Sequence, residues 1–542
     1  MTKIWHRQYD PGVPHEIDPD AYTSVWSMAE GAIGKYGSNR AFHNFGATLS
    51  FDDIDRLSRD FAAYLQSDLG LAKGDRIAIM TPNIMAFPIT LFAVLRAGLV
   101  QVNVNPLYTP RELKHQLNDA DTETIVIFSG STSVLAEIVG ETKIKNTITA
   151  NLGDFGNAEL SSPPVDERLE GTVAFTDAVA KGGGRPFESP AITGDDLLFL
   201  QYTGGTTGLS KGAVLTHRNL VANIVAMEAC FDAPDPNDPE IVITALPLYH
   251  IFALMVNCLV YFLRGGLNVL ITNPRDMEGF VKELGNWQFS VMTGVNTLYN
   301  GLLHTPGFAE LDFSKLKVVA GGGTAIQEAV STHFKDVTGM HIKEGYGLSE
   351  TSPVVTFNPI KMTRFTNSIG VPVPSTDVSI RDDENREMPV GEPGELCVKG
   401  PQVMQGYWRQ PEATAAVMTE DGYFRTGDIA LMTEEGFFRI VDRKKDMVLV
   451  SGFNVYPNEI ETVMAGMDGA LESASIGIPD DHSGEAVKLF VVRAEGGEIT
   501  ADEVEAYCRE NLTAYKVPKH IEFIDALPKS PVGKILRREL RD

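Results

Sequence analysis

Short, continuously apolar runs alternate along the chain with stretches of helical periodicity, and this alternation restricts the fold more than any other feature. Asp53–Leu69 carries apolar residues at helical spacing, and Ile89–Leu95 resembles a buried helix. The strand-like runs are Arg76–Met80, Thr124–Phe128, Leu197–Tyr202, Ile241–Ala245, Leu267–Ile271 and Leu316–Val319. Buried strands separated by helices are typical of parallel sheets whose faces the helices cover. We therefore predict an α/β fold with mostly parallel sheets and flanking helices.

A charged junction at Asp442–Asp446 (DRKKD) divides the chain into a long first part and a short second part. With 542 residues, of which 43% are hydrophobic, the chain is too long for one ordinary domain. Strands and a helix at Ala501–Leu512 follow the junction and make a compact α+β unit. We predict a large domain over residues 1–441, an exposed hinge at 442–446 and a small domain over residues 447–542.

Residues 153–190 are rich in Gly, Pro, Ser and acidic residues. Such composition is typical of chain that connects elements on the surface rather than of a packed element. We predict a surface loop or linker here, partly mobile.

The composition excludes several classes of function. A formal net charge of -26 argues against duplex nucleic acid as a partner and against attachment to anionic lipid by charge alone. The four cysteines are scattered without metal-ligand spacing, which predicts reduced cytosolic thiols. The first residues lack the apolar core of a secretion signal. The longest apolar run, Ile251–Leu263, is shorter than the roughly 20 residues that span a bilayer, so we predict a buried helix.

A glycine- and threonine-rich segment is the strongest chemical signal in the sequence. Glycines let the backbone approach phosphate groups, hydroxyls add hydrogen-bond donors, and a lysine adds positive charge. This combination suits a triphosphate ligand. The candidate ligand-binding residues are Tyr202, Thr203, Gly204, Gly205, Thr206, Thr207, Gly208 and Lys211.

Two other motifs resemble parts of this segment but fit it less well. Lys211 is followed by Gly212, whereas a Walker A loop places Ser or Thr after its lysine. Gly208–Gly212 (GLSKG) matches the GxSxG elbow of serine hydrolases, but that elbow needs a sharp strand-to-helix turn. Here the next helix is expected only after Thr216, a good N-cap residue. A serine hydrolase using Ser210 is therefore a minor alternative.

Nine spaced motifs together resemble the adenylate-forming superfamily, and within it the bacterial long-chain fatty-acyl-CoA ligases. The resemblance runs from about Asp20 to the C-terminus. Its motifs are the segment Tyr202–Gly212, Leu246–His250, Gly321–Gly323, Gly345–Thr351, Gly394–Leu396, Tyr423–Asp428, Asp442–Asp446, Ser451–Val455 and Pro528–Lys534. The resemblance implies a large domain that includes a small barrel-like β part, and a mobile small domain. It also implies two half-reactions, in which a carboxylate and ATP give acyl-adenylate and pyrophosphate, and coenzyme A then takes the acyl group.

The resemblance also implies roles for individual residues. Lys534 would bridge the carboxylate and the α-phosphate, and Glu350, with Thr203, would bind Mg²⁺. Lys445 matches the hinge residue, and His250 would border the acid. The implied contacts to ATP and coenzyme A come from Gly322, Gly323, Gly345, Tyr346, Gly347, Ser349, Asp428, Arg443 and Gly452. A solvated lysine at 534, a core tyrosine at 346 and a packed core histidine at 250 are the alternatives on residue type alone.

The identity of the acid is the least determined prediction. Tyr249 and His250 stand where peptide-synthetase domains usually carry Phe and Asp, which disfavours an amino acid substrate. Some long-chain members place a Trp gate near Leu254, and this chain does not. We predict a fatty acid:CoA ligase, with a medium-chain, aryl or sulfur-containing short acid as the alternative. A non-catalytic nucleotide-binding protein and an adenylation domain serving a carrier protein fit the motifs less well.

The expected partners are a small carboxylic acid, ATP and coenzyme A, with no nucleic acid. We expect a cytoplasmic protein whose contact with the inner face of the membrane is peripheral at most. A homodimer is compatible with the sequence.

Overall fold

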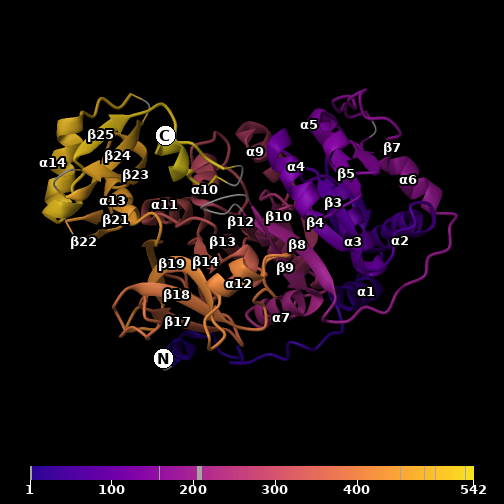
Figure 1. Ribbon diagram of the computed structural model, residues 1–542, viewed down its shortest axis with the longest axis horizontal. Helices are drawn as coiled ribbons and strands as arrows, with labels where there is room; N and C mark the ends of the chain where they lie inside the picture. Colours follow the sequence, from indigo (N-terminus) through magenta and orange to yellow (C-terminus); the bar gives the residue numbers. More distant parts are fainter. Residues whose placement is uncertain are drawn as a thin grey trace.

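Mostly parallel strands, with helices between many of them, form two large sheets in the first three quarters of the chain, as the computed structural model shows (Figure 1). The structure describes residues 3–157, 159–203, 210–451, 453–480, 483–494, 496–530 and 533–541. The predicted α/β class is confirmed. Among these residues, no helix is both long and apolar enough to cross a membrane.

The first sheet has seven strands in the order β7-β6-β5-β3-β4-β8-β9, all parallel except for the antiparallel pair β8 and β9. Its strands are β3 (Arg76–Met80), β4 (Val100–Asn103), β5 (Thr124–Phe128), β6 (Asn146–Ala150), β7 (Val173–Ala174), β8 (Leu197–Thr203) and β9 (Lys211–Thr216). Its helices are α2 (Phe51–Ser67), α3 (Ala86–Ala97), α4 (Pro110–Asp119), α5 (Thr132–Ile138) and α6 (Phe175–Gly182). The predicted strands at Arg76–Met80 and Thr124–Phe128 agree with β3 and β5.

The second sheet has nine strands in the order β16-β15-β14-β13-β12-β10-β11-β1-β2. Its strands are β1 (Arg40–Asn44), β2 (Ala47–Ser50), β10 (Ile241–Thr244), β11 (Leu267–Leu270), β12 (Val291–Gly294), β13 (Val318–Gly321), β14 (Lys343–Gly347), β15 (Val354–Phe357) and β16 (Val371–Pro372). The associated helices are α1 (Val25–Tyr36), α7 (His217–Glu228), the π-helical segment η4 (Ala253–Val260), α8 (Tyr261–Leu263), α9 (Met277–Leu284), α10 (Asn296–Leu303) and α11 (Glu328–Thr338). The strand predicted at Leu316–Val319 begins two residues later than expected.

The β part that precedes the junction is an antiparallel sheet in the order β17-β18-β19-β20. Its elements are β17 (Asp377–Arg381), β18 (Gly394–Lys399), α12 (Pro411–Val417), β19 (Phe424–Met432) and β20 (Phe438–Arg443). Strand β20 bridges at Phe438 to Gly370, beside β16, so the expected barrel-like part is an open sheet that continues onto the second sheet.

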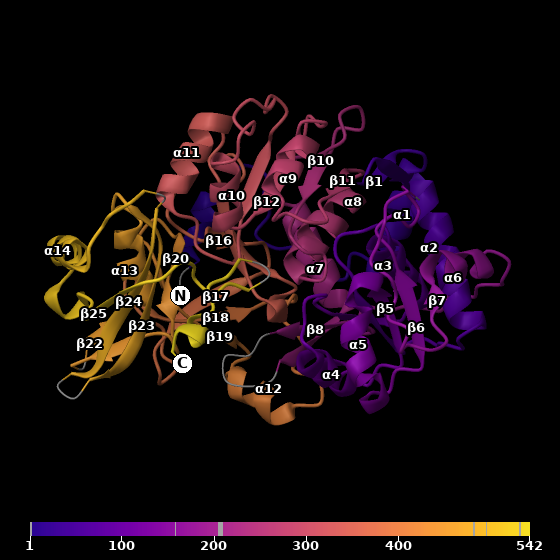
Figure 2. The same ribbon diagram turned by 90° about the horizontal axis from the view of Figure 1, so that it is seen from above.

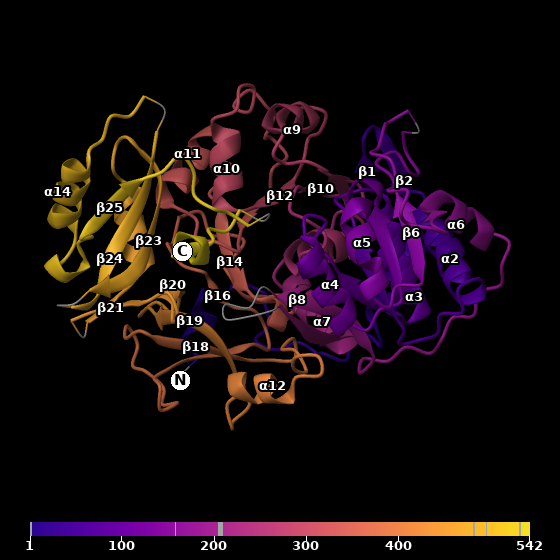
Figure 3. The same cartoon turned by 45° about the horizontal axis from the view of Figure 1, so that its top comes forward.

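The small C-terminal domain contains the fourth sheet and lies at the opposite end of the molecule from β5 and β6, with β20 at the junction (Figures 2 and 3). Its strands are β21 (Val448–Val450), β22 (Phe453–Val455), β23 (Ala470–Asp480), β24 (Gly484–Arg493) and β25 (His520–Phe523). Its helices are α13 (Pro457–Met464), α14 (Ala501–Asn511) and the last turn η7 (Arg537–Leu540).

The prediction of a loop at residues 153–190 was wrong for residues 173–182, which form β7 and α6. Helix α6 buries Phe175, whose ring lies 4.8 Å from that of Phe61 on α2. The helix crosses α2 so closely that a Cβ on Gly182 would stand 1.7 Å from the Asp60 carbonyl oxygen. The glycines that suggested a loop therefore permit close helix packing.

The N-terminal turn η1 (Ile4–Gln8) packs against the end of the molecule that carries the junction. Trp5 is fully buried, and its ring lies 5.7 Å from that of Phe438 on β20. Gly436 allows this approach, since a Cβ there would be 2.9 Å from the Trp5 backbone. The first residues of the chain thus complete the core of the β17–β20 sheet.

Candidate active site

One large cavity of about 1940 Å³ lies between the large and small domains. In the large domain it is lined by the chain that follows the carboxyl ends of β8, β10, β13 and β14. Ligands of open parallel sheets bind at this end of the strands, where successive loops diverge. The small domain adds lining residues from α13, the start of β23 and the segment Gly533–Arg538.

A corner of the cavity is built from Tyr346, Asp428 and Arg443, which come from three strands. The Tyr346 hydroxyl donates to Asp428 Oδ2 at 2.5 Å, and Arg443 Nε lies 3.0 Å from Asp428 Oδ1. Asp428 and Arg443 are directly opposed residues of β19 and β20. Burial and the Asp428 charge hold the pKa of Tyr346 well above its ordinary value, so it stays a hydroxyl. These three predicted contacts to ATP and coenzyme A therefore form one hydrogen-bonded unit.

Glu350 lies in the turn η5 (Ser349–Thr351) and is buried in the cavity wall. The Tyr407 hydroxyl donates to Glu350 Oε1 at 2.9 Å, and Thr203 Oγ1 lies 3.5 Å from the same oxygen. Burial raises the pKa of Glu350, while these hydroxyls and Arg443 oppose that shift. No group of three or more potential metal ligands occurs among the described residues. Because Mg²⁺ commonly uses one or two carboxylates together with substrate phosphates, one carboxylate beside a hydroxyl fits that ion.

Lys534 enters the cavity from the small domain. Burial, then the neighbouring charges of Arg443 and Lys445, lower its pKa to about 8, and Asp428 partly offsets this. The fold thus brings Lys534 and the Asp428 corner to one cavity, although they are far apart in the chain.

His250 faces the same space from the loop after β10. Burial, and then the charge of Lys534, lower its pKa to about 4, so the ring is neutral at pH 7. The Phe252 backbone N–H donates to its Nδ1 at 3.4 Å. The proton of the neutral ring is therefore on Nε2, which makes His250 a hydrogen-bond donor.

The central residues of the predicted phosphate loop, Gly204, Gly205, Thr206, Thr207 and Gly208, lie outside the described residues, and so does Gly452. The loop connects β8 to β9, in which Thr203 and Lys211 are directly opposed. Lys211 Nζ stands 5.1 Å from the centre of the Tyr407 ring. The Tyr202 hydroxyl donates to Asp119 at 2.5 Å, so it is engaged within the fold.

The hydrolase alternative does not fit this geometry. Ser210 precedes strand β9, whereas a nucleophile elbow is followed by a helix. His115 Nε2 contacts the Ser210 carbonyl oxygen at 2.8 Å, which is a backbone contact. The predicted helix start after Thr216 is confirmed, because Thr216 caps α7.

The remaining predicted residues line the same cavity. They are Gly322, Gly323, Gly345, Gly347, Ser349 and Lys445. Gly347 is required sterically, because a Cβ there would be 1.9 Å from the Pro353 carbonyl oxygen, and Gly323 has a φ of +78°. The junction was predicted to be exposed, but only Lys444 and Lys445 are exposed, while Asp442 and Asp446 are buried.

Sequence reasoning missed two cavity residues. Tyr407 was not selected, because no motif marks it. Glu344 was also missed, although it lies in β14 directly before the Gly345–Thr351 motif. Burial raises its pKa to about 8, and its carboxylate accepts the Ile326 backbone N–H at 3.0 Å.

Comparison with known proteins agrees with this geometry. The family model for AMP-binding enzymes matches residues 30–408, and the model for the AMP-binding enzyme C-terminal domain matches residues 459–534. The chain therefore belongs to the family of AMP-binding enzymes. The long-chain-fatty-acid–CoA ligase of Yersinia pestis is 51% identical to it, over all of this chain and 98% of that protein.

Two solved structures of MatB from Rhodopseudomonas palustris are each 29% identical to this chain. The ATP-bound form has a TM-score of 0.82 over 95% of this chain and 98% of that one. The apo form has a TM-score of 0.72 over 96% of this chain and 98% of that one. The arrangement described above is thus more similar to the ATP-bound form.

Proposed function

We propose that this protein is an ATP-dependent long-chain fatty acid:CoA ligase that works through an acyl-adenylate. The observation that carries the proposal is the meeting of Lys534, His250, Glu350 and the Tyr346–Asp428–Arg443 unit in one cavity. The relative from Yersinia pestis supports the substrate class.

In the first half-reaction a carboxylate oxygen of the fatty acid attacks the α-phosphorus of ATP. A bond forms between these two atoms, the bond from the α-phosphorus to the bridging oxygen breaks, and pyrophosphate leaves with the electron pair. Two anions must approach each other, so charge neutralisation is the main task of the protein. Lys534 supplies that charge, and the Nε2–H of His250 donates to the carboxylate. Mg²⁺, held by Glu350 and Thr203, would add positive charge at the phosphates.

In the second half-reaction the sulfur of coenzyme A attacks the acyl carbon. The carbon–oxygen bond to the phosphate breaks, AMP leaves, and the thiol proton is lost to water. We propose that residues 447–542 first rotate as a unit about the 442–446 hinge, with residues 1–441 fixed, so that Lys534 withdraws. Phe453 is 56% exposed in the present arrangement and stacks on Tyr515 at 4.8 Å. We propose that Phe453, together with Gly452, lines the pantetheine passage after rotation.

The two MatB comparisons support a two-state domain arrangement. Identity and coverage are nearly equal for the two forms, while the TM-scores differ by form. We infer that the present arrangement is the one for adenylation.

The acyl chain would extend between α7 and η4. The cavity there is lined by apolar and aromatic side chains, namely Met227, Phe231, Phe252, Val256 and Tyr261. A long alkyl chain gains free energy from such burial in proportion to its length.

The test is a pyrophosphate-release assay with ATP, Mg²⁺ and coenzyme A. Palmitate is compared with medium-chain, aryl and sulfur-containing short acids. We expect the highest kcat/KM with palmitate. The highest value with another acid would reject the long-chain assignment, and no release with any acid would reject the whole proposal.

We further propose a cytoplasmic location with peripheral membrane contact at most. Co-sedimentation with anionic vesicles tests the membrane contact. Sedimentation velocity tests the proposed homodimer.

A further inference from the structure

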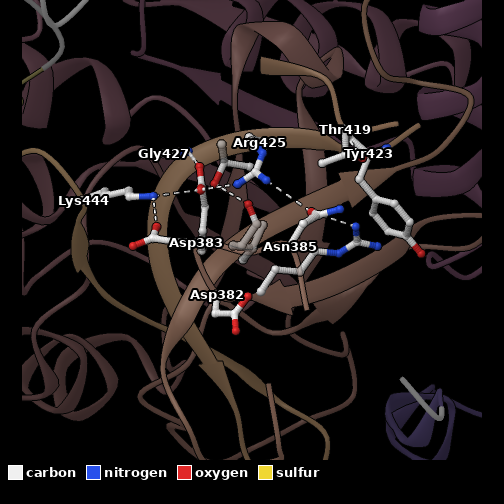
Figure 4. Close-up of polar contacts among 12 residues, drawn as sticks. Asp382, Asp383, Asn385, Thr419, Tyr423, Arg425, Gly427 and Lys444 are labelled. Atoms are coloured by element: carbon white, nitrogen blue, oxygen red, sulfur yellow. Dashed lines mark hydrogen bonds and ion pairs between the residues drawn. The ribbon is translucent and has the colours of Figure 1, made fainter. Parts of the chain in front are cut away.

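Lys445 is the point where the chain passes from one set of anchoring contacts to another. On the large-domain side, Lys444 Nζ lies 2.6 Å from Asp383 Oδ1, and its backbone N–H donates to the Gly427 carbonyl at 3.0 Å. Figure 4 shows Lys444 and Asp383 pointing toward each other. On the small-domain side, Asp446 is buried and pairs with Arg541 at 2.9 Å. A rotation between the domains is therefore confined to Lys445 and the turn in which Asp446 and Met447 donate to the Arg443 carbonyl.

Helix α13 is the first helix after Lys445, which we call the pivot. The backbone N–H at its start donates to a residue on the large-domain side of this pivot. Its own N-cap residue, Tyr456, makes no side-chain cap. Instead the backbone N–H of Asn458 donates to Asp442 Oδ2 at 2.8 Å. Helix starts leave unpaired N–H groups, and a carboxylate is the strongest partner for them. Asp442 lies at the end of β20, on the large-domain side of Lys445, and is fully buried by this contact.

The contact between Asp442 and Asn458 is connected by hydrogen bonds to the Lys534 segment on one side and to Arg443 on the other. Arg537, three residues after Lys534, donates to Asn458 Oδ1 at 2.8 Å and pairs with Glu461 at 2.7 Å. The other Asp442 oxygen accepts the Arg443 backbone N–H at 2.6 Å. Asp442 thus stands between the Asp428 corner and the helix that supports the Lys534 segment.

We propose that Asp442 is a positioning residue that holds the small domain in its adenylation arrangement by capping α13 across the pivot. A rotation at Lys445 removes this cap, exposes the Asp442 carboxylate to water, and leaves α13 without a side-chain partner. Asp442 therefore favours the first half-reaction without touching either substrate. The inference rests on the proposed function.

The test compares two single-turnover reactions in Asp442→Asn and Asp442→Ala. One is the formation of palmitoyl-adenylate from palmitate and ATP, and the other is the conversion of preformed palmitoyl-adenylate and coenzyme A to palmitoyl-CoA. Loss of one helix cap changes an equilibrium by about tenfold. We expect the ratio of the first rate to the second to fall by about tenfold in Asp442→Ala. Asp442→Asn, which keeps one acceptor, should lie between Asp442→Ala and the unsubstituted protein.

Asp276→Ala is the matched control. Asp276 caps α9, which like α13 has eight residues, by accepting the Gly279 N–H at 3.0 Å, and the whole contact lies in the large domain. This variant loses a cap of the same kind at a solvent-exposed helix start, and its rate ratio should equal that of the unsubstituted protein. An unchanged ratio in Asp442→Ala, whether or not both rates fall, would overturn the proposal.

A distance measurement tests the same inference without turnover. Spin labels are placed at Val390→Cys and Leu449→Cys, which are 43% and 48% exposed, in a Cys230→Ser background. With ATP present we expect one main distance in the otherwise unsubstituted protein and a second population in Asp442→Ala. Identical distance distributions in the two proteins would contradict the proposed role of Asp442. If no acid gives pyrophosphate release but the distance distribution shifts in Asp442→Ala, the proposed activity is rejected and the positioning role of Asp442 is kept.

Discussion

The two domains hold their parts of the active site in different ways. In the large domain, Asp428 is 3% exposed, lies on a central strand of its sheet and is fixed by Tyr346 and Arg443. In the small domain, Lys534 is hydrogen-bonded to Ser530, whose backbone N–H donates to the Lys534 carbonyl at 2.7 Å and whose Oγ accepts the Lys534 backbone N–H at 3.1 Å. The contact between Asp442 and Asn458 across the junction is polar. Polar contacts can be replaced by hydrogen bonds to water at small net cost, whereas separating apolar surfaces exposes them to water at a cost that grows with their area. We therefore propose that the ATP-binding residues belong to a fixed core, while Lys534 is carried on a domain that can move away from it.

Removal of the mobile cation is the strongest way to test this contrast. In Lys534→Ala, palmitoyl-adenylate formation should fall by about 10²–10³-fold, which is typical when one preorganised charge-stabilising group is lost. Conversion of preformed palmitoyl-adenylate by coenzyme A should change little. Single-turnover assays of both steps measure this, and equal losses would mean that Lys534 belongs to the fixed core.

The fall of kcat/KM at alkaline pH shows which domain carries the group whose protonation the reaction requires. Lys534 is charged below its pKa of about 8 and loses its proton as the pH rises through that value. We therefore expect kcat/KM for adenylation to fall about tenfold per pH unit above this pKa.

Glu344 of the large domain is the competing source of such a fall, since its pKa is also about 8. Lys534→Arg keeps its charge throughout the range, because arginine is protonated at every relevant pH. The fall should disappear in Lys534→Arg. A fall that persists there would assign it to the large domain.

A smaller effect is expected from a change within the fixed core. Tyr346→Phe removes the hydroxyl that orients Asp428 but leaves its pairing with Arg443. We expect the KM for ATP to rise about fivefold to tenfold with kcat nearly unchanged, which corresponds to the roughly 1 kcal/mol that one hydrogen bond typically contributes. Initial-rate kinetics with varied ATP measure this, and a dominant fall in kcat would place Tyr346 in the chemical step.

Among the described residues, sequence reasoning selected most of the polar groups that meet in the cavity, because motifs mark them. It missed what only packing determines. The pairing of Asp442 with Asn458 joins two residues whose local patterns give no sign of contact. Tyr407 reaches Glu350 from a loop 57 positions away. Helix α6 has only eight residues, so its apolar periodicity is weak, and it contains the glycine that its close packing requires. The Gly-rich composition of the segment therefore predicted a loop instead.

The burial of Trp5 has a consequence for how fragments of this protein should be cut. The family model begins at residue 30, yet the indole of residue 5 fills the interior beside Phe438 on the strand that ends at the junction. A truncation designed from the family boundary would leave a hole about the size of a tryptophan under that strand. Affinity tags should therefore be joined to the intact first residues through a spacer, and shortened versions should be judged by their melting temperature before any loss of turnover is interpreted.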